Sequence, residues 1–178
     1  MKTPIAFALG IALLTGCTAP KKQVIVIHEN TFFRCEPSNV IGKKMVRLIN
    51  NARAKARKCG FKRCPVSPPV RWDSKLAKAA LNHSIDMANN DMLSHVGSNG
   101  SVLNERVEEV GYAWCAIGEN VSGGRETCED VVSAWLTSPR HCRNIMNSSF
   151  TEIGAACFRN QSSKYGTYWT LVLASPRE

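Results

Sequence analysis

The stretch IGAACFRNQSSKYGTYWTLVL, residues 153–173, decides the fold class of this chain. It contains two short runs rich in apolar, β-branched and aromatic residues, at positions 153–158 and 168–173, with a polar loop containing Gly166 between them. Such runs, joined by a short loop with a glycine, predict a β-hairpin. The strand signal is concentrated near the C-terminus, and the preceding chain has a different pattern.

The first strong helical pattern lies between residues 41 and 56. Its apolar residues recur at spacings of three and four, which places them on one face of a helix. Gly60 is expected to end this helix, because glycine is favoured just beyond a helix C-terminus. Three prolines between residues 65 and 69 then predict an extended loop.

Three further helices are predicted before the hairpin. Their expected N-cap residues are Asp73 or Ser74, Ser101, and Thr127. Pro139 is expected to end the last of these helices. Residues 116–121 predict one more strand. Helices followed by strands indicate an α+β domain in which helices cover a sheet.

The first sixteen residues have the features of a lipoprotein signal peptide. Lys2 supplies a positive charge, and residues 5–14 form an apolar run that is too short to span a bilayer at about 20 residues. The run ends in Leu14-Thr15-Gly16-Cys17, which resembles the lipobox of bacterial lipoproteins. This resemblance implies cleavage before Cys17 and diacylation of its thiol. An ordinary signal peptide with an incidental cysteine is the alternative.

The lipobox also implies a location and a domain organisation. Thr18 follows Cys17, and in Gram-negative lipoproteins a residue other than Asp at that position implies export to the outer membrane. We therefore expect a cell-envelope protein attached to the outer membrane through its lipid anchor. Residues 17–39 are expected to form the tether, in which the β-prone run at 24–27 could be an edge strand, and residues 40–178 the folded domain.

The net charge of +9 does not by itself identify a partner. A basic surface attracts nucleic acid, anionic lipid or anionic cell-wall polymer. Basic residues cluster between positions 43 and 63, interleaved with apolar residues at helical spacing. This pattern indicates a helix whose basic residues form its solvated face. No nucleic-acid-binding motif accompanies the charge, so nucleic acid is not an expected partner.

Seven cysteines remain beyond Cys17. In an exported chain, cysteines at this density indicate disulfide bonds, and at least two intramolecular bonds are expected. Because the number is odd, at least one thiol is free or pairs with another molecule. The nearest pair, Cys59 and Cys64, is too widely spaced for the close CxxC pairs of a zinc ribbon.

Short motifs spread over residues 42–175 resemble the CAP superfamily, which comprises cysteine-rich secretory proteins, insect antigen 5 and plant pathogenesis-related proteins. The resemblance is greatest to the bacterial SCP-domain branch. In order, the motifs are Asn51-Ala52-Arg53-Ala54, Trp72-Asp73-Ser74-Lys75-Leu76, His83-Ser84-Ile85-Asp86-Met87-Ala88, Leu93-Ser94-His95, Gly111-Tyr112, Gly118-Glu119-Asn120-Val121, Trp135-Leu136-Thr137-Ser138-Pro139-Arg140-His141, Asn144-Ile145-Met146-Asn147 and Ile153-Gly154. The resemblance implies a three-layer α-β-α sandwich, which agrees with the helix and strand pattern.

The resemblance also implies a cleft in which histidine and acidic residues bind a divalent cation in some family members. Carried over by motif, the candidate metal ligands are His95, Glu119 and His141, and such a set suits Zn²⁺. The family's second acidic residue has no counterpart here, so Ser138 is a weak substitute in the ligand cleft. Asn120 completes this predicted cleft by fixing the turn beside Glu119. The alternative is a metal-free polar cleft with the same histidines hydrogen-bonded to Glu119 and neighbouring backbone.

Two further expectations concern individual residues. His83 lies within the second predicted helix, and its neighbours do not form a metal motif, so we expect a partly buried structural histidine. In related bacterial sequences a cysteine after the first helix often accompanies one beside the second cleft histidine. The resemblance therefore implies a disulfide between Cys59 and Cys142.

The function predicted from these features is a non-enzymatic binding module on the cell envelope, with a lipid, glycan or protein ligand. The alternative is a metal-dependent envelope hydrolase, a peptidase or an esterase, in which a metal-bound water loses its proton near neutral pH. Three candidate ligands from distant positions do not establish a general acid, a nucleophile or an oxyanion hole. The sequence contains no glycine-rich phosphate loop and no nucleophile elbow.

Overall fold

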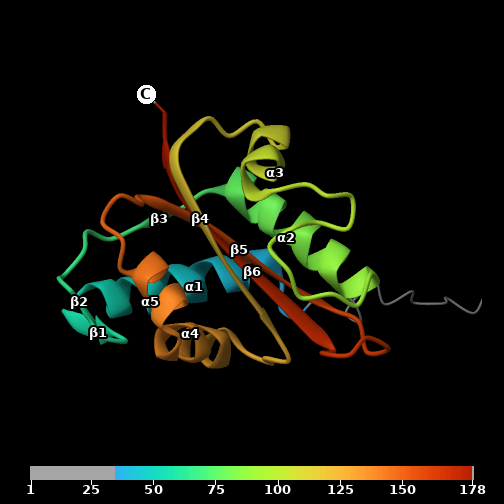
Figure 1. Cartoon of the computed structure of the whole chain (residues 1–178), viewed down its shortest axis with the longest axis horizontal. Coiled ribbons are helices and arrows are strands. Elements are labelled where there is room, and N and C mark those ends of the chain that lie inside the picture. The colour runs from blue at the N-terminus through green and yellow to red at the C-terminus, as the bar shows by residue number, and fades with distance from the viewer. Residues whose placement is uncertain (1–34, 178) are drawn as a thin grey trace, which may run out of the picture.

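The structure is a computed structural model that describes residues 35–177 of the 178-residue chain (Figure 1). The predicted signal peptide, the lipid attachment site Cys17 and the β-prone run at 24–27 lie outside the described residues and stay predictions. Among the described residues, no helix is long and apolar enough to cross a membrane.

A four-stranded sheet with the order β3-β5-β6-β4 lies at the centre of the fold. β5 (Glu152–Arg159) and β6 (Thr167–Pro176) pair antiparallel, which confirms the predicted C-terminal hairpin. β4 (Trp114–Gly123) pairs antiparallel with the other edge of β6. The two-residue β3 (Arg71–Trp72) runs parallel to β5 and covers only its first residues.

Helices cover both faces of this sheet (Figure 1). One face carries α1 (Ser38–Arg53), α4 (Cys128–Thr137) and α5 (Pro139–Ile145), and the other carries α2 (Ser74–Asn89) and α3 (Leu103–Glu109). Alternate side chains of β6 serve the two layers, because successive strand residues point to opposite faces. Trp169 and Leu171 pack in the α1 layer, and Val172 packs in the α2 layer. The predicted α+β class and α-β-α sandwich are confirmed.

Gly154 permits α2 to lie directly on β5. A Cβ atom at this position would lie 2.0 Å from the backbone nitrogen of Ala77 and 2.6 Å from the Cβ of Leu76. The N-terminus of α2 is fixed nearby, where the Asp73 side chain accepts a hydrogen bond from the Leu76 amide. The Ile153-Gly154 motif therefore sets the distance between helix and sheet.

One expected helix boundary is wrong, and another is confirmed. Helix α1 ends at Arg53, and Gly60 instead forms the turn between β1 (Arg57–Cys59) and β2 (Lys62–Cys64), where its φ of 65° favours glycine. Pro139 follows the end of α4 at Thr137, as expected, and it also has a second role. It opens α5 at a position where its missing N–H costs no helical hydrogen bond.

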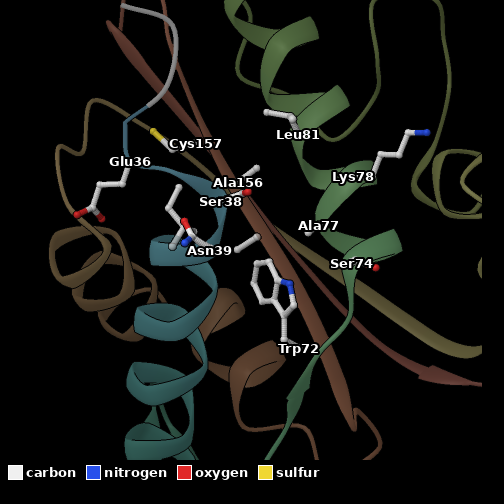
Figure 2. Close-up of a pocket in the computed structure, with 12 residues that line it drawn as sticks. Glu36, Ser38, Asn39, Trp72, Ser74, Ala77, Lys78, Leu81, Ala156 and Cys157 are labelled. Carbon is white, nitrogen blue, oxygen red and sulfur yellow. The ribbon is translucent and has the colours of Figure 1, made fainter. Parts of the chain in front are cut away.

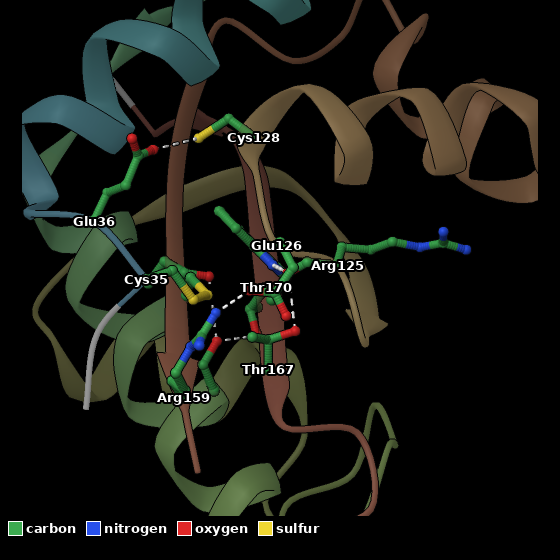
Figure 3. Close-up of a disulfide and its surroundings, with 12 residues drawn as sticks. Cys35, Glu36, Arg125, Glu126, Cys128, Arg159, Thr167 and Thr170 are labelled. Atoms are coloured by element: carbon green, nitrogen blue, oxygen red, sulfur yellow. Dashed lines mark hydrogen bonds and ion pairs between the residues drawn. A yellow bond between two sulfur atoms is a disulfide. The ribbon is translucent and has the colours of Figure 1, made fainter. Parts of the chain in front are cut away.

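Two disulfide bonds tie these elements together. Cys59 is bonded to Cys142, the pairing that the resemblance implies, and this bond joins the β1–β2 hairpin to α5. Cys35 is bonded to Cys157 in β5 (Figure 3). Residues 35–39, expected in the tether, thus belong to the folded domain. Of the other cysteines within residues 35–177, Cys64 and Cys128 are buried thiols and Cys115 is exposed.

Arg53, the last residue of α1, is completely buried and has backbone carbonyls as its partners. Its Nε donates to Pro68 O at 2.6 Å, Nη1 to Ile145 O at 2.8 Å and Asn147 O at 2.9 Å, and Nη2 to Phe150 O at 3.0 Å. Burial lowers the pKa of this guanidinium. One side chain thereby joins α1 to the proline-rich loop and to the segment between α5 and β5.

Replacing Arg53 by Lys should lower the free energy of unfolding by about 3 kcal/mol, because an ammonium group cannot satisfy four carbonyls arranged around a planar fork. Urea unfolding followed by tryptophan fluorescence measures this change. Arg47 provides the control: it lies on the same helix, exposed, in an ion pair with Glu129 at 3.1 Å. Arg47→Lys should change stability by less than about 0.5 kcal/mol. Equal midpoints for the two variants would contradict this role of Arg53.

Candidate functional site

Glu119 lies in β4 with 7% of its surface exposed, and both of its carboxylate oxygens are engaged. Oε1 lies 2.7 Å from Nδ1 of His95, and Oε2 accepts a hydrogen bond from Nη2 of Arg106 at 2.8 Å. A buried carboxylate needs such partners, because desolvation of an unpaired charge is costly. The structure therefore brings together two of the three predicted site residues, and adds an arginine to them.

Arg106 was not among the sequence-predicted site residues. It lies on α3 and also donates to Ser101 O at 2.8 Å and His95 O at 3.1 Å. It thus holds the loop that carries His95 against β4. Helical periodicity does contain the signal, because Arg106 follows Leu103 by three residues and lies on the face of α3 that packs inward.

His83 lies behind this pair on α2 and is buried, with 1% of its surface exposed. Its Nε2 lies 2.9 Å from Ser94 O and 4.0 Å from Oε1 of Glu119. Since a carbonyl only accepts, the neutral ring carries its proton on Nε2. Burial lowers the pKa of His83, against the opposing effect of Glu119. The residue is therefore a structural helix histidine, more deeply buried than expected.

His141 lies on α5, where its backbone contacts β4, and it is half-buried. Burial, and then the nearby charge of His95, lower the pKa of its ring. Its backbone carbonyl accepts a hydrogen bond from Asn120 Nδ2 at 3.2 Å, and Asn144 Nδ2 donates to Asn120 Oδ1 at 2.9 Å. Asn144 also donates to Glu119 O at 3.0 Å, so the two asparagines connect β4 to α5.

The two predicted cleft residues have different positions. Asn120 is completely buried, and its amide is used between β4 and α5, so it positions neighbouring residues and does not face a ligand. Ser138 lies half-buried at the junction of α4 and α5, where its backbone carbonyl accepts from the Cys142 amide at 2.8 Å.

The arrangement does not fit a metal centre as it stands. Within residues 35–177, no group of three or more His, Cys, Asp or Glu side chains is placed to hold a metal ion. One oxygen of Glu119 is paired with the positive charge of Arg106, and the other with His95. A dication at this carboxylate would have to displace or face that guanidinium. Zn²⁺ at His95, Glu119 and His141 stays a prediction, and the observed contacts favour the metal-free cleft.

A separate apolar groove lies between α1 and α2, along the edge of β5 that the short β3 leaves uncovered. Its cavity volume is about 380 Å³ (Figure 2). Ile41 of α1, Trp72 of β3 and Leu81 of α2 line it, and charged residues border it at Lys78 and Glu36. No motif in the sequence points to this groove, because its lining residues come from distant segments.

Comparison with known proteins identifies the family. The family model described as "Cysteine-rich secretory protein family", CAP, matches residues 46–173. The chain belongs to the CAP family. This CAP chain is 32% identical over 155 residues to the uncharacterized protein YkwD of Bacillus subtilis, covering 86% of the chain but only 54% of YkwD.

Solved structures show the same CAP fold. An extracellular SCP-domain protein of Bacillus anthracis superposes with a TM-score of 0.63 at 23% identity, over 77% of this chain and 41% of that one. An outer surface protein of Borrelia burgdorferi gives a TM-score of 0.61 at 16% identity, over 78% and 92% of the two chains. At these identities the likeness concerns the fold alone.

The histidines of this CAP domain should titrate in a fixed order. The hydrogen bond to Glu119 raises the pKa of His95 above its ordinary value of 6.5, whereas burial lowers the pKa of His83 and His141 below it. NMR titration of the ring protons measures all three. In Glu119→Gln the pKa of His95 should fall towards 6.5, because the carboxylate that favours the imidazolium is gone.

The same shift fixes how stability depends on pH. A raised folded-state pKa means that the contribution of His95 is fully present below pH 6.5 and is lost as pH rises through the folded pKa. His95→Gln should therefore destabilise the domain more at acidic pH than at alkaline pH, as measured by urea unfolding. A histidine order with His141 above His95 would contradict this assignment.

Proposed function

We propose that this CAP domain is a non-enzymatic binding module of the cell envelope whose groove takes a lipid acyl chain with an anionic head group. The observation that carries the proposal is the apolar lining of the groove between α1 and α2, with Ile41, Trp72 and Leu81 around a cavity of about 380 Å³. Ligand pockets are typically apolar clefts of this size with a few polar groups. Among lipid, glycan and protein ligands, this lining supports the lipid.

The charge at the border of the groove supports an anionic head group. Lys78 is exposed on α2, and no ion pair involves it in the part of the chain that the structure describes. Glu36 lies at another part of the border, where its Oε1 is paired with Lys44 Nζ at 2.7 Å. The acidic residue is thus neutralised and the lysine is available, so a carboxylate or phosphate would be favoured beside Lys78.

The contacts of Glu119 support binding rather than hydrolysis. A metal-dependent hydrolase at His95, Glu119 and His141 would need the carboxylate as a ligand or a base, and Arg106 and His95 occupy it. We therefore place the envelope hydrolase second. The polar residues around Glu119 join three layers of the fold. This structural role explains why they are buried, and no catalytic role is needed to explain it.

The proposed location rests on the sequence before the described residues. The lipobox ending at Cys17 supports a lipid-anchored protein of the outer membrane in a Gram-negative cell. The Bacillus anthracis and Borrelia burgdorferi proteins with this fold are described as extracellular and as an outer surface protein, which agrees with a position outside the cytoplasm.

The groove should bind a fluorescent fatty acid such as parinaric acid. Titration of the full chain measures the affinity, with Leu81→Gln expected to weaken binding about tenfold because it places a polar amide in the apolar lining. Lys78→Glu should weaken binding of the fatty acid by up to about fivefold, which is the contribution expected of an exposed ion pair. Binding of the matching fatty alcohol, which has no charge, should not change.

Lys164→Glu is the matched control, because it makes the same charge change on an exposed lysine of the β5–β6 loop. Equal affinity of the parent chain and Leu81→Gln would exclude the groove. Turnover of a generic ester or peptide that is lost on adding a chelator and in a His95→Ala, His141→Ala variant would instead support the hydrolase.

Anchoring is tested separately. Cys17→Ser should abolish incorporation of a fatty-acid analogue into the protein in labelled cells, because the thiol that would be diacylated is gone. Undiminished label on the variant would refute the lipobox assignment. The outcome is independent of the groove, which lies between residues 36 and 157.

A further inference from the structure

The β1–β2 hairpin carries an aromatic side chain that the rest of the described chain leaves uncovered. Phe61 follows Gly60 at the turn and is 108% exposed. The hairpin lies at one end of the molecule, beside α5 (Figure 1). A single exposed apolar residue is ordinary in a soluble protein. A phenylalanine at the tip of a hairpin, with cations on both sides, is a more specific arrangement.

The cations around Phe61 have no acidic residue close to them in the sequence. Lys58, Lys62 and Arg63 are exposed on the two strands, and Arg140 and Arg143 are exposed on α5. Residues 53–72 and 139–151 contain no Asp or Glu. Within residues 35–177, no ion pair involves any of these five side chains. Their positive charge is therefore available to an external partner.

The hairpin is held in place before any partner arrives. The Cys59–Cys142 disulfide joins it to α5, the Gly60 turn lies against Pro139, and the Cys64 side chain is buried at its other strand. Arg57 also donates to Ala52 O at the end of α1. Little conformational entropy remains to be lost on binding, which is the advantage of a preorganised surface.

We propose that this hairpin docks on the surface of an anionic phospholipid membrane, with Phe61 at the boundary of head groups and acyl chains and the lysines and arginines on lipid phosphates. Aromatic residues and cations together match this boundary, where one part of the surface is apolar and the other negatively charged. A soluble anionic polymer would use the cations but leave Phe61 in water, so the exposed aromatic residue favours the membrane.

This surface is distinct from the groove of the proposed function. The groove includes the first turns of α1, whereas the hairpin follows the end of that helix. The sixteen residues of α1 span about 24 Å. Loss of fatty-acid binding in the groove variants and loss of membrane docking in the hairpin variants are therefore separate results.

The test places a reporter at the hairpin tip in the full chain. Phe61→Trp is mixed with vesicles of phosphatidylcholine and phosphatidylglycerol, or of phosphatidylcholine alone, with brominated phosphatidylcholine as quencher. The parent chain gives the signal of the four native tryptophans. We expect the introduced tryptophan to shift to shorter wavelength and to be quenched on the anionic vesicles only. This readout reports position 61 itself, whatever other segment attaches to the vesicle.

A matched pair of charge variants tests the cations. The double variant Lys58→Glu, Lys62→Glu should weaken binding of the chain to anionic vesicles at least about tenfold, because each basic residue near an anionic surface adds to the binding free energy. Arg125→Glu with Lys164→Glu makes the same charge change on exposed residues away from the hairpin and should weaken it by less than about threefold.

Two results would overturn the proposal. One is an introduced tryptophan that stays unquenched on anionic vesicles to which the chain is bound. The other is equal weakening by the two charge pairs. A further measurement then identifies the partner. If Phe61→Ala binds soluble polyphosphate as tightly as the parent chain does, and the Lys58→Glu, Lys62→Glu variant binds it less tightly, the surface binds a soluble anionic polymer and not a membrane.

Discussion

Arg53 connects segments that the chain itself does not bring together. Its guanidinium donates to carbonyls on the proline-rich loop and on both sides of the turn that leads from α5 to β5. That loop leads into β3 and that turn into β5, and the two strands pair. A buried cation without a carboxylate partner is tolerated because four oriented dipoles replace its hydration. The relative placement of α1, β3 and β5, and with it one wall of the apolar groove between α1 and α2, depends on this contact.

Glu119 also connects distant segments, on the other side of the sheet. It joins β4 to α3 through Arg106 and to the loop between α2 and α3 through His95, while Asn144 on α5 donates to its backbone carbonyl. Residues that the family motifs mark as a cleft are therefore also the polar contacts between layers. A carboxylate already paired with an arginine is a poor ligand for a dication, since the two cations would repel each other. Structural and ligand-binding roles compete here for the same oxygens.

Local signals predicted the elements whose cause is local. The capping residues Asp73 and Thr127 start α2 and α4 as expected, and the C-terminal strands follow their apolar runs. Gly60 was misassigned because glycine is used both at helix ends and in turns. Pro139 was correctly expected after α4, but its role at the start of α5 was missed because proline suits both places. The contact of Arg106 with Glu119, and the groove, were missed because the residues involved are distant in sequence. Helical periodicity places Arg106 on the inward face of α3, but it does not show which distant residues pack there.

The Cys35–Cys157 bond determines where mechanical load enters the domain. Any pull on the chain before Cys35 passes through this covalent link into β5, an inner strand paired with β6 along its length. The first turn of α1, which begins at Ser38, is shielded from that force. To extend the domain from this end, several antiparallel hydrogen bonds would have to shear at once instead of breaking one by one. A domain held at its N-terminal side would thus resist unravelling at the point where tension is greatest.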